Sequence, residues 1–204
     1  KGKTTTASLV AHILNSAGFL TGKITSVYFG VGEKVWQNET KQGMPGRFQI
    51  QKLLDQMVKA GCKYAVVETT SEGILQFRHR FIDYNLAVFT NLSPEHIERH
   101  GSFENYRAAK LKLFERVALK KGGVGIFNLD DSNVKYFLKP KVWKHYGYTL
   151  KFFDHTKFLP DKIDEVLEVR EVKITSVGTE FVVRNQKFTT PLIGEFNVYN
   201  TLAA

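Results

Sequence analysis

Apolar residues recur at helical spacing in three segments of the chain. The first segment closes near Gly18, and the second runs from residue 48 to residue 60 and closes at Gly61. The third begins after Ser102, a residue type that favours the N-cap position. Short, almost wholly apolar runs are typical of strands buried in a parallel sheet, and three are present: 64–67, 86–89 and 125–127. This alternation predicts right-handed βαβ units and an α/β fold, with a mostly parallel sheet covered by helices on both faces.

Other regions have different patterns. Residues 23–28 are expected to form a short strand, and the polar, glycine-rich segment 30–46 is expected to be a loop long enough to be functional. After Pro160 the apolar residues alternate with polar ones, which predicts antiparallel strands at 167–174, 180–184 and 187–190. We therefore expect three regions: a core (1–160), a small antiparallel β subdomain (161–193), and a return into the core (194–204) with a helix starting near Asn200.

The net charge limits the kinds of binding partner, and the cysteine count limits the cellular compartment. The chain carries 29 Lys and Arg residues against 20 Asp and Glu residues, a net charge of +9. The basic residues are spread along the sequence, which favours polyanionic small molecules as partners, with nucleic acid as the alternative. Cys62 is the single cysteine, which excludes an internal disulfide and favours a reducing cytoplasm. No apolar run approaches the roughly 20 residues of a membrane span, so we expect no membrane partner.

The hexapeptide Lys1–Thr6 runs directly into the first helix. A Gly-Lys-Thr sequence in this position matches the second half of a phosphate-binding loop, whose backbone N–H groups cradle phosphates. In such loops the lysine reaches the β and γ oxygens, and the threonine hydroxyl meets Mg²⁺. The first glycine of the pattern would precede Lys1, and there is no initiator Met, so we expect the chain to be a piece of a longer protein. A chance tripeptide in a lysine-rich protein is the alternative.

Polar residues follow three of the predicted strands: Glu68, Asn91 and Asp130. Ligands bind beyond the carboxyl ends of the strands in a parallel sheet, so these residues and the phosphate loop should collect at one edge. Glu68 is then placed to hold Mg²⁺, and a solvated carboxylate at a strand end is the alternative. The turn 128–131 fits either an aspartate that caps the next helix or direct contact with substrate.

The segment 95–100 and Lys110 differ in how strongly the sequence alone indicates a functional role. Residues 95–100 contain two histidines and two glutamates, a density that exceeds what a structural loop requires. Lys110, in contrast, has the spacing of a surface lysine on a helix.

Six motifs in order resemble the Mur ligase family, the ATP-dependent amide-forming enzymes of peptidoglycan precursor assembly: Gly2–Thr6, Val67–Gly73, Phe89–His96, Ala108–Lys110, Asn128–Asp131 and Gly194–Asn200. The resemblance spans essentially the whole chain and corresponds to the central ATPase domain of the family, a P-loop α/β core. The stretches 68–78 and 91–110 are most similar to the tripeptide synthetases, which add the third residue to UDP-MurNAc-L-Ala-D-Glu. The resemblance implies that the UDP-binding and amino-acid-binding domains lie outside this sequence.

The resemblance implies a role for each matching residue. Lys3, His96 and Lys110 would form the catalytic set, and Lys110 matches a lysine that many members carboxylate with CO₂ to organise metal. Thr4 would contact one Mg²⁺, and Glu68 with His96 would hold a second. The ATP-binding residues would be Gly2, Lys3, Thr4 and Thr5 at the phosphates, Asn197 and Asn200 at the adenine, and Asn128 and Asp131 in the neighbouring nucleotide pocket. The residues at the sugar-peptide substrate would be Thr70, Ser71 and Arg78.

The sequence departs from the family pattern in two places. Tripeptide synthetases commonly read Ser-Ser-His where this chain has Thr70-Ser71-Glu72, so a titratable donor is replaced by a carboxylate. Many members show Thr-Thr-Pro where this chain has Gly43-Met44-Pro45, which lacks the hydroxyl groups. Both departures concern the acceptor substrate, and the motifs for ATP chemistry are retained.

The implied reaction is phosphorylation of a substrate carboxylate by ATP, followed by attack of an amino group on the acyl phosphate and release of ADP and phosphate. UDP-MurNAc-peptide and an amino acid would be the partners of a cytoplasmic monomer that serves cell-wall synthesis, cell shape and division, and the fragment alone would be inactive. A folylpolyglutamate or cyanophycin synthetase would share the ATP loop but use another acceptor. A P-loop nucleic-acid ATPase would account for the charge of +9 and predicts salt-sensitive binding, but it leaves the cluster 91–96 unexplained.

Overall fold

The chain divides into two compact units. The computed structural model describes residues 1–40, 42–94, 97–151 and 163–204. Unit 1 comprises Lys1–Gly2, Asp83–Glu95 and Leu111–Ala203, and unit 2 comprises Lys3–Ile82, His96–Lys110 and Ala204. Each unit contains its own β-sheet. The domain boundaries expected at residues 160 and 193 stay predictions.

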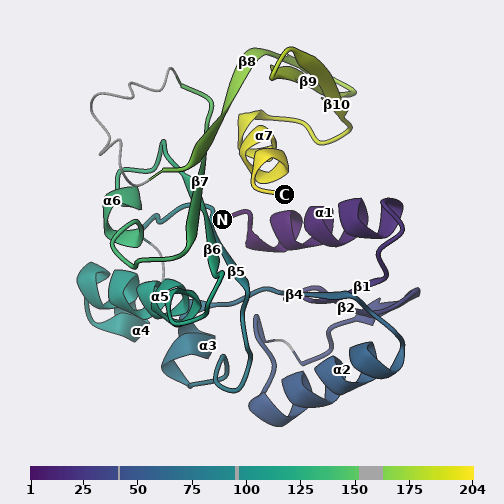
Figure 1. Ribbon diagram of the computed structural model, residues 1–204, viewed down its shortest axis with the longest axis vertical. Helices are drawn as coiled ribbons and strands as arrows, with labels where there is room; N and C mark the ends of the chain where they lie inside the picture. Colours follow the sequence, from purple (N-terminus) through teal and green to yellow (C-terminus); the bar gives the residue numbers. More distant parts are fainter. Residues whose placement is uncertain (41, 95–96, 152–162) are drawn as a thin grey trace. The chain divides into compact units, whose positions relative to one another are not determined.

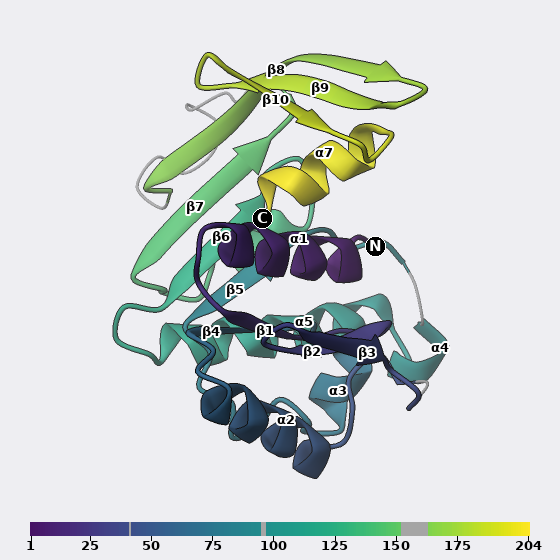
Figure 2. The same ribbon diagram turned by 90° about the vertical axis from the view of Figure 1, so that its right-hand side faces the viewer.

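Unit 2 is built on a four-stranded sheet with the order β3-β2-β1-β4. The strands are β1 (Thr21–Ile24), β2 (Tyr28–Val31), β3 (Lys34–Gln37) and β4 (Tyr64–Val67). β1 and β4 are parallel, whereas β2 pairs with both β1 and β3 in the antiparallel sense. Figure 1 and Figure 2 show helix α1 (Lys3–Ser16) on one face of this sheet and α2 (Arg47–Lys59) on the other. The expected cover of helices on both faces is therefore confirmed in unit 2.

The segment 28–37 differs from its sequence prediction. The predicted loop 30–46 is wrong in its first part, because β2 and β3 form a hairpin there. The predicted strand 23–28 is divided between β1 and β2, which are antiparallel neighbours. Gly32 lies in the hairpin turn with a φ of 59°, a conformation that glycine adopts without strain. All four residues of β3 are exposed, so the sequence lacks the alternation of apolar and polar positions that identifies a strand.

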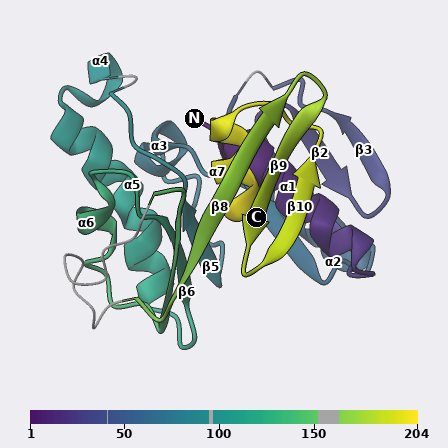
Figure 3. The ribbon, with the colours of Figure 1, turned by 90° about the horizontal axis from the view of Figure 1, so that it is seen from above.

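Unit 1 is built on a six-stranded sheet with the order β10-β9-β8-β7-β6-β5. The strands are β5 (Leu86–Phe89), β6 (Val124–Asn128), β7 (Lys144–Thr149), β8 (Glu165–Thr175), β9 (Gly178–Val183) and β10 (Gln186–Thr190). Neighbours from β5 to β8 are parallel, and β8, β9 and β10 are antiparallel. The α/β class is confirmed, and the antiparallel strands extend the parallel sheet (Figure 3).

Strand β7 has no counterpart among the predicted strands. Its sequence, Lys-His-Tyr-Gly-Tyr-Thr, contains no aliphatic residue, yet His145, Gly147 and Tyr148 are buried. A Cβ atom at Gly147 would overlap the side chain of Leu129, so the close packing of β7 depends on a glycine that a hydrophobic pattern does not register.

Helix α7 (Glu195–Leu202) packs against β7, β8 and β9. It begins earlier than the start near Asn200 that the sequence suggests, and Gly194 precedes it with a φ of 104°. Val198 is fully buried in a cluster with Val169, Phe181 and Val183. The helix therefore closes the hydrophobic core beneath the antiparallel strands (Figure 3).

Aromatic side chains form the core beside β5 and β6. Phe89 stacks on Phe137 of α6 (Val134–Phe137), with ring centroids 4.1 Å apart. Phe114 of α5 (Phe103–Ala118) lies 5.4 Å from Phe127, measured between ring centroids. Ser102 caps α5 as expected, because its Oγ accepts a hydrogen bond from the Asn105 amide at 3.1 Å.

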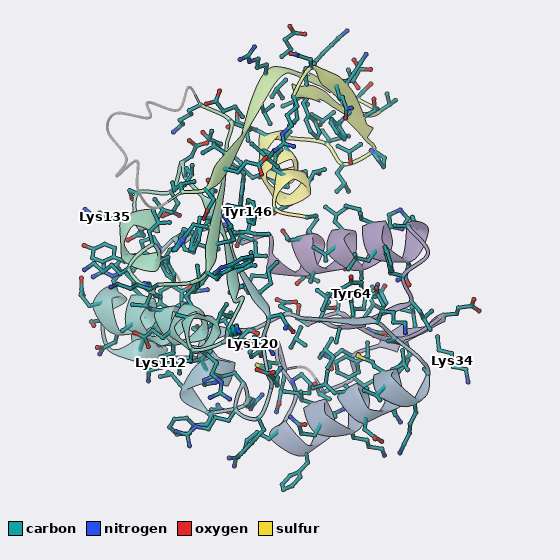
Figure 4. The ribbon with its side chains drawn as sticks, viewed as in Figure 1. Lys34, Tyr64, Lys112, Lys120, Lys135 and Tyr146 are labelled. Carbon is teal, nitrogen blue, oxygen red and sulfur yellow. The ribbon has the colours of Figure 1, made fainter. Side chains whose placement is uncertain are left out.

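Basic residues stand on separate elements of the two units, for example Lys34 on β3, Lys112 on α5 and Lys135 on α6 (Figure 4). Their dispersal along the elements agrees with their dispersal along the sequence. None of the helices described for residues 1–40, 42–94, 97–151 and 163–204 is long and apolar enough to cross a membrane.

Candidate functional site

The hydroxyl group of Thr4, in the first turn of α1, meets the carboxylate that follows β4. Thr4 Oγ1 donates a hydrogen bond to Glu68 Oε2 at 2.8 Å and lies 2.8 Å from the Oγ atom of Ser26. The backbone N–H of Ser26 donates to the same Glu68 oxygen at 2.9 Å. Glu68 is only 6% exposed, so these contacts hold a buried carboxylate in one orientation. Unit 2 thus brings together two residues that the sequence assigned to the phosphate and metal site.

The oxygen atoms around Thr4 suit Mg²⁺, which prefers hard oxygen ligands and keeps several waters. Glu68 supplies a carboxylate there, and Thr4 and Ser26 supply hydroxyl groups. The described residues contain no cluster of three or more His, Cys, Asp or Glu side chains that could hold a metal ion. Phosphate and water oxygens would therefore have to complete the coordination. The predicted ligand His96 lies outside the described residues.

Lys3 and Thr5 occupy the same first turn as Thr4. Lys3 is the first residue of α1, and both side chains are half-buried. Backbone N–H groups in the first turn of a helix lack partners within the helix, and the positive end of the helix dipole lies there. The turn is therefore suited to anion binding, as the sequence predicts.

Lys110 lies on α5 within unit 2, directly after the buried Ala109. Its Nζ atom stands 5.0 Å from the ring centroid of Tyr106, one helical turn earlier. Tyr106 is 5% exposed, so the lysine side chain lies along a buried aromatic face and is only half-buried itself. Carboxylation of Lys110 stays a prediction.

A pocket of about 310 Å³ lies within unit 1. It gathers residues from the start of the chain, from the ends of β5, β6 and β7, and from α7: Lys1, Gly2, Thr90, Asn91, Asn128, Asp130, Asp131, Tyr148, Lys151, Phe196, Tyr199 and Asn200. Four of the predicted nucleotide-binding residues are among them, namely Gly2, Asn128, Asp131 and Asn200. The pocket therefore joins motifs that are far apart in the sequence.

Gly2 and Asn200 meet closely in this pocket. A Cβ atom at Gly2 would overlap Oδ1 of Asn200, and Gly2 has a φ of 80°. Both the close approach and the backbone conformation require glycine. Asn200 in turn donates through Nδ2 to Oδ1 of Asn197 at 3.1 Å, so the two asparagines predicted for the adenine contact each other.

Asp130 and Asp131 hold the loops of the pocket together. Asp131 accepts hydrogen bonds from the backbone N–H groups of Leu92 and Asn133 at 2.7 and 2.8 Å. Asp130 accepts from the Tyr199 hydroxyl at 2.7 Å and from the Leu150 amide at 2.8 Å. The N-cap residue of α6 is Asn133, and no side chain caps this helix, so Asp131 does not cap it as the first alternative for the turn 128–131 expected. Asp131 instead ties the turn to the residues after β5, and its contact with nucleotide stays a prediction.

The hydrogen bond from Tyr199 to Asp130 is expected to stabilise the folded protein. Burial, followed by the hydrogen bond to Asp130, raises the pKa of Tyr199 above its ordinary value, so the phenol stays protonated and donates. We expect Tyr199→Phe to lower the free energy of unfolding by about 1–2 kcal/mol, measured by urea denaturation. Tyr28→Phe, at an exposed position, is the matched control and should have no measurable effect. Equal stability of the two variants would contradict this role.

The residues predicted for the sugar-peptide substrate surround α3 (Ser71–Leu75). Thr70 caps this helix, because its Oγ1 accepts from the Gly73 amide at 3.0 Å. Ser71 Oγ lies 3.2 Å from Nε2 of His100, at the end of α4 (Ile97–His100). Unit 2 therefore connects Ser71 to the second histidine of the segment 95–100.

Arg78 donates hydrogen bonds to three neutral oxygen atoms. The acceptors are Gln42 Oε1 at 2.6 Å, the main-chain oxygen of Met44, and Gln76 Oε1. Within the described part of the chain Arg78 forms no ion pair. Neutral acceptors orient the guanidinium without cancelling its charge, which suits the group to an anionic ligand.

Both departures from the family pattern have local partners. Glu72 forms an ion pair with Arg99 at 2.6 Å, so the carboxylate that replaces a histidine is balanced by a cation on α4. Met44 is 1% exposed, and a Cβ at Gly73 would come within 2.6 Å of its sulfur atom. Met44 therefore fills space against α3, at a position where the family resemblance led us to expect a hydroxyl group.

The sequence did not predict several residues that line the pocket of unit 1. Phe196 and Tyr199 fall inside the motif 194–200, so the motif itself was the signal that could have found them. Tyr148 and Lys151 come at and after the end of β7, a strand that was not predicted. Because β7 was not predicted, the pocket residues that it positions were not predicted either.

The whole chain, residues 1–204, matches the family model of the Mur ligase middle domain. It is 33% identical over 222 residues to UDP-N-acetylmuramyl-tripeptide synthetase from Roseiflexus sp. (strain RS-1), covering 100% of this chain and 41% of that protein. It is 32% identical over 208 residues to UDP-N-acetylmuramoyl-L-alanyl-D-glutamate--2,6-diaminopimelate ligase from Halalkalibacterium halodurans, covering 100% of this chain and 40% of that protein. The chain therefore spans about two fifths of the length of these curated relatives.

A solved structure of a UDP-N-acetylmuramoyl-L-alanyl-D-glutamate--2,6-diaminopimelate ligase has the same fold over the full chain. The TM-score is 0.78 at 28% sequence identity, and the match covers 100% of this chain and 40% of that one.

Proposed function

Because the chain belongs to the Mur ligase family, as a match to its middle domain, we propose that it is the ATP-binding part of an ADP-forming ligase of peptidoglycan precursor synthesis. The complete enzyme would join an amino acid to a UDP-MurNAc-peptide in the cytoplasm. The observation that carries the proposal is the hydrogen bond from Thr4, at the phosphate-binding turn, to the buried carboxylate of Glu68. This bond joins the two motifs that ATP chemistry needs first.

The reaction proceeds by two displacements. A carboxylate oxygen of the UDP-MurNAc-peptide attacks the γ-phosphorus of ATP, and ADP leaves. The amino group of the incoming amino acid then attacks the acyl carbon, phosphate leaves, and the amide forms after loss of a proton. Charge accumulates on phosphate oxygens in both steps, so fixed positive charges and N–H donors supply most of the acceleration.

The residues of unit 2 serve the phosphates. The first turn of α1 offers backbone N–H groups to the phosphate oxygens, and the ammonium group of Lys3 neutralises charge on the γ-phosphate. Glu68 orients the Thr4 hydroxyl, and Thr4, Glu68 and His96 would hold Mg²⁺. When bound, Mg²⁺ neutralises the charge that develops on the phosphoryl oxygens.

The pocket of unit 1 serves the nucleoside. Asn128 and Asn200 line it with amide groups, which have both donor and acceptor atoms, as adenine recognition requires. Asn128 already donates one N–H to the main-chain oxygen of Thr90 and accepts from the Asp130 amide, so its second N–H is the donor it would offer a base. Arg78 binds an anionic group of the UDP-MurNAc-peptide, because its neutral neighbours leave its charge intact. These assignments make the chain a module that needs an acceptor substrate and an amino acid to turn over ATP.

An ADP-release assay on the complete protein tests the function. We expect ATP hydrolysis to depend on both UDP-MurNAc-L-Ala-D-Glu and one amino acid from a panel that includes diaminopimelate and lysine. Omission of either substrate is the internal control and should reduce ADP release to background. ADP release that no amino acid stimulates would contradict the ligase assignment. Stimulation by DNA or RNA in place of these substrates would favour a nucleic-acid ATPase.

A further inference from the structure

His100 has no role in the site as assigned above, although it lies beside a residue that has one. It is the last residue of α4 and is 8% exposed. Its Nε2 atom lies 3.2 Å from Oγ of Ser71, which is itself 7% exposed. A histidine and a serine that are both buried and within hydrogen-bonding distance constrain each other's orientation.

The surroundings of His100 fix the imidazole ring. The imidazole and the ring of Tyr106 pack in a T-shaped arrangement, with centroids 5.0 Å apart and an interplanar angle of 65°. The main-chain oxygen of His100 accepts from Nδ2 of Asn105 at 3.0 Å. Gly101 follows with a φ of 74°, so the chain turns from α4 into α5 at a residue that tolerates this conformation.

Two consecutive contacts connect α4 to α3. Arg99 pairs with Glu72 at 2.6 Å, and His100 meets Ser71 beside it. The exposed ion pair contributes little to stability by itself, because both side chains are about half exposed or more. We therefore expect the buried contact between His100 and Ser71 to fix the position of α4 against α3 more than the exposed ion pair does.

The direction of the hydrogen bond decides what Ser71 can do. A serine hydroxyl has one proton to donate and two lone pairs to accept with. If His100 donates through Nε2–H, one lone pair of Ser71 is occupied and its proton remains for another acceptor. If Ser71 donates to His100 instead, the hydroxyl can only accept from a ligand. The first arrangement suits an anionic ligand such as a carboxylate, which has only acceptor atoms.

We propose that His100 is a positioning residue that donates through Nε2–H to Ser71 and thereby directs the Ser71 proton to a carboxylate of the UDP-MurNAc-peptide. The inference rests on the proposed function, which assigns Ser71 to this substrate. The same imidazole contacts Tyr106. The Nζ atom of Lys110 lies over the Tyr106 ring, 5.0 Å from its centroid. His100 thus connects the substrate-binding end of α3 to the helix that carries a predicted catalytic lysine.

Steady-state ADP release by the complete enzyme tests the inference with four variants: His100→Leu, His100→Gln, Ser71→Ala, and the double variant His100→Leu with Ser71→Ala. Leucine keeps an apolar volume but lacks the donor, whereas glutamine keeps an N–H donor of similar reach. We expect His100→Leu to raise the KM for UDP-MurNAc-L-Ala-D-Glu by about 3- to 10-fold, the value of one hydrogen bond, and to leave the KM for ATP unchanged. Glutamine should largely restore the parental KM.

The double variant separates positioning from a merely structural role. Because His100 acts through Ser71, Ser71→Ala should match His100→Leu, and the double variant should be no worse than either. Multiplied effects in the double variant, equal rises in both KM values, or a glutamine variant no better than leucine would each overturn the inference. Ser71→Ala removes a single oxygen and is expected to fold, so the test remains valid if His100→Leu does not fold.

The proposed function and the inference fail in different ways. A parental enzyme that turns over ATP with both substrates, combined with an unchanged KM in His100→Leu and Ser71→Ala, would overturn the inference alone. A parental enzyme that UDP-MurNAc-peptide does not stimulate would overturn both.

Discussion

Lys3→Ala should abolish ATP turnover by the complete enzyme, a loss of at least about 100-fold in kcat for ADP release. Lys3 begins α1, where backbone N–H groups face outward from the first turn. The ammonium group of Lys3 supplies a positive charge at this turn, and we expect neutralisation of the transferring phosphoryl group to depend on it. The side chain is half-buried and stands at the end of a helix, so alanine should leave the fold intact.

Lys34→Ala is the matched control for this experiment. Lys34 is an exposed lysine on β3 in the same unit and lies outside the phosphate-binding turn (Figure 4). The control should keep parental kcat, and both variants should keep the parental melting temperature within about 1–2 °C. ATP turnover by Lys3→Ala at the parental rate would contradict the assignment of a phosphate-binding loop.

Glu68→Gln should reduce ADP release and raise the Mg²⁺ concentration for half-maximal rate by about 10- to 100-fold. The substitution keeps the shape of the side chain but removes the charge that favours a divalent cation. It also changes the acceptor oxygen that serves both Thr4 Oγ1 and the Ser26 amide. Titration of ADP release with Mg²⁺ at saturating ATP measures the shift.

Glu33→Gln removes the same charge from an exposed position near the hairpin turn of unit 2. It should leave the Mg²⁺ dependence unchanged. If Glu68→Gln and Glu33→Gln have the same Mg²⁺ titration as the parent, Glu68 is a structural carboxylate and the metal assignment is wrong.

The parts of the fold with a clear hydrophobic period were predictable from the sequence. The apolar runs 64–67 and 86–89 coincide with β4 and β5. The burial that such a run predicts is found in part of β5, whereas β4 is an edge strand with exposed and half-buried residues. The helices around residues 48–60 and 103–118 carry apolar stripes and recognisable ends. Elements without such a stripe were missed, as β3 and β7 show. The residues of β3 are all exposed, so the strand has no apolar face to recognise. In β7 a glycine and a histidine occupy buried positions where a hydrophobic pattern would need aliphatic residues.

The sequence identified several residues that the structure brings into contact, and their functional roles stay predictions. The sequence placed Glu68 after a strand and Thr4 in a phosphate-binding turn, and the two side chains are hydrogen-bonded. The family resemblance assigned Asn200 to the adenine and Asn128 to the neighbouring nucleotide pocket, and both residues line the same pocket of unit 1. The contact of His100 with Ser71 joins segments 29 residues apart, and no spacing rule in the sequence indicates it. The expected gathering of Glu68 with Asn91 and Asp130 at one sheet edge stays a prediction.

Transfer of an oxygen label from substrate to phosphate tests whether the enzyme forms an acyl phosphate. UDP-MurNAc-L-Ala-D-Glu labelled with ¹⁸O in the carboxyl groups of its glutamate is incubated with ATP and the stimulating amino acid, and the released phosphate is analysed by mass spectrometry. Formation of an acyl phosphate transfers one carboxyl oxygen to each phosphate that leaves, so we expect one ¹⁸O per phosphate when labelling is complete. Unlabelled phosphate released together with amide product would contradict it.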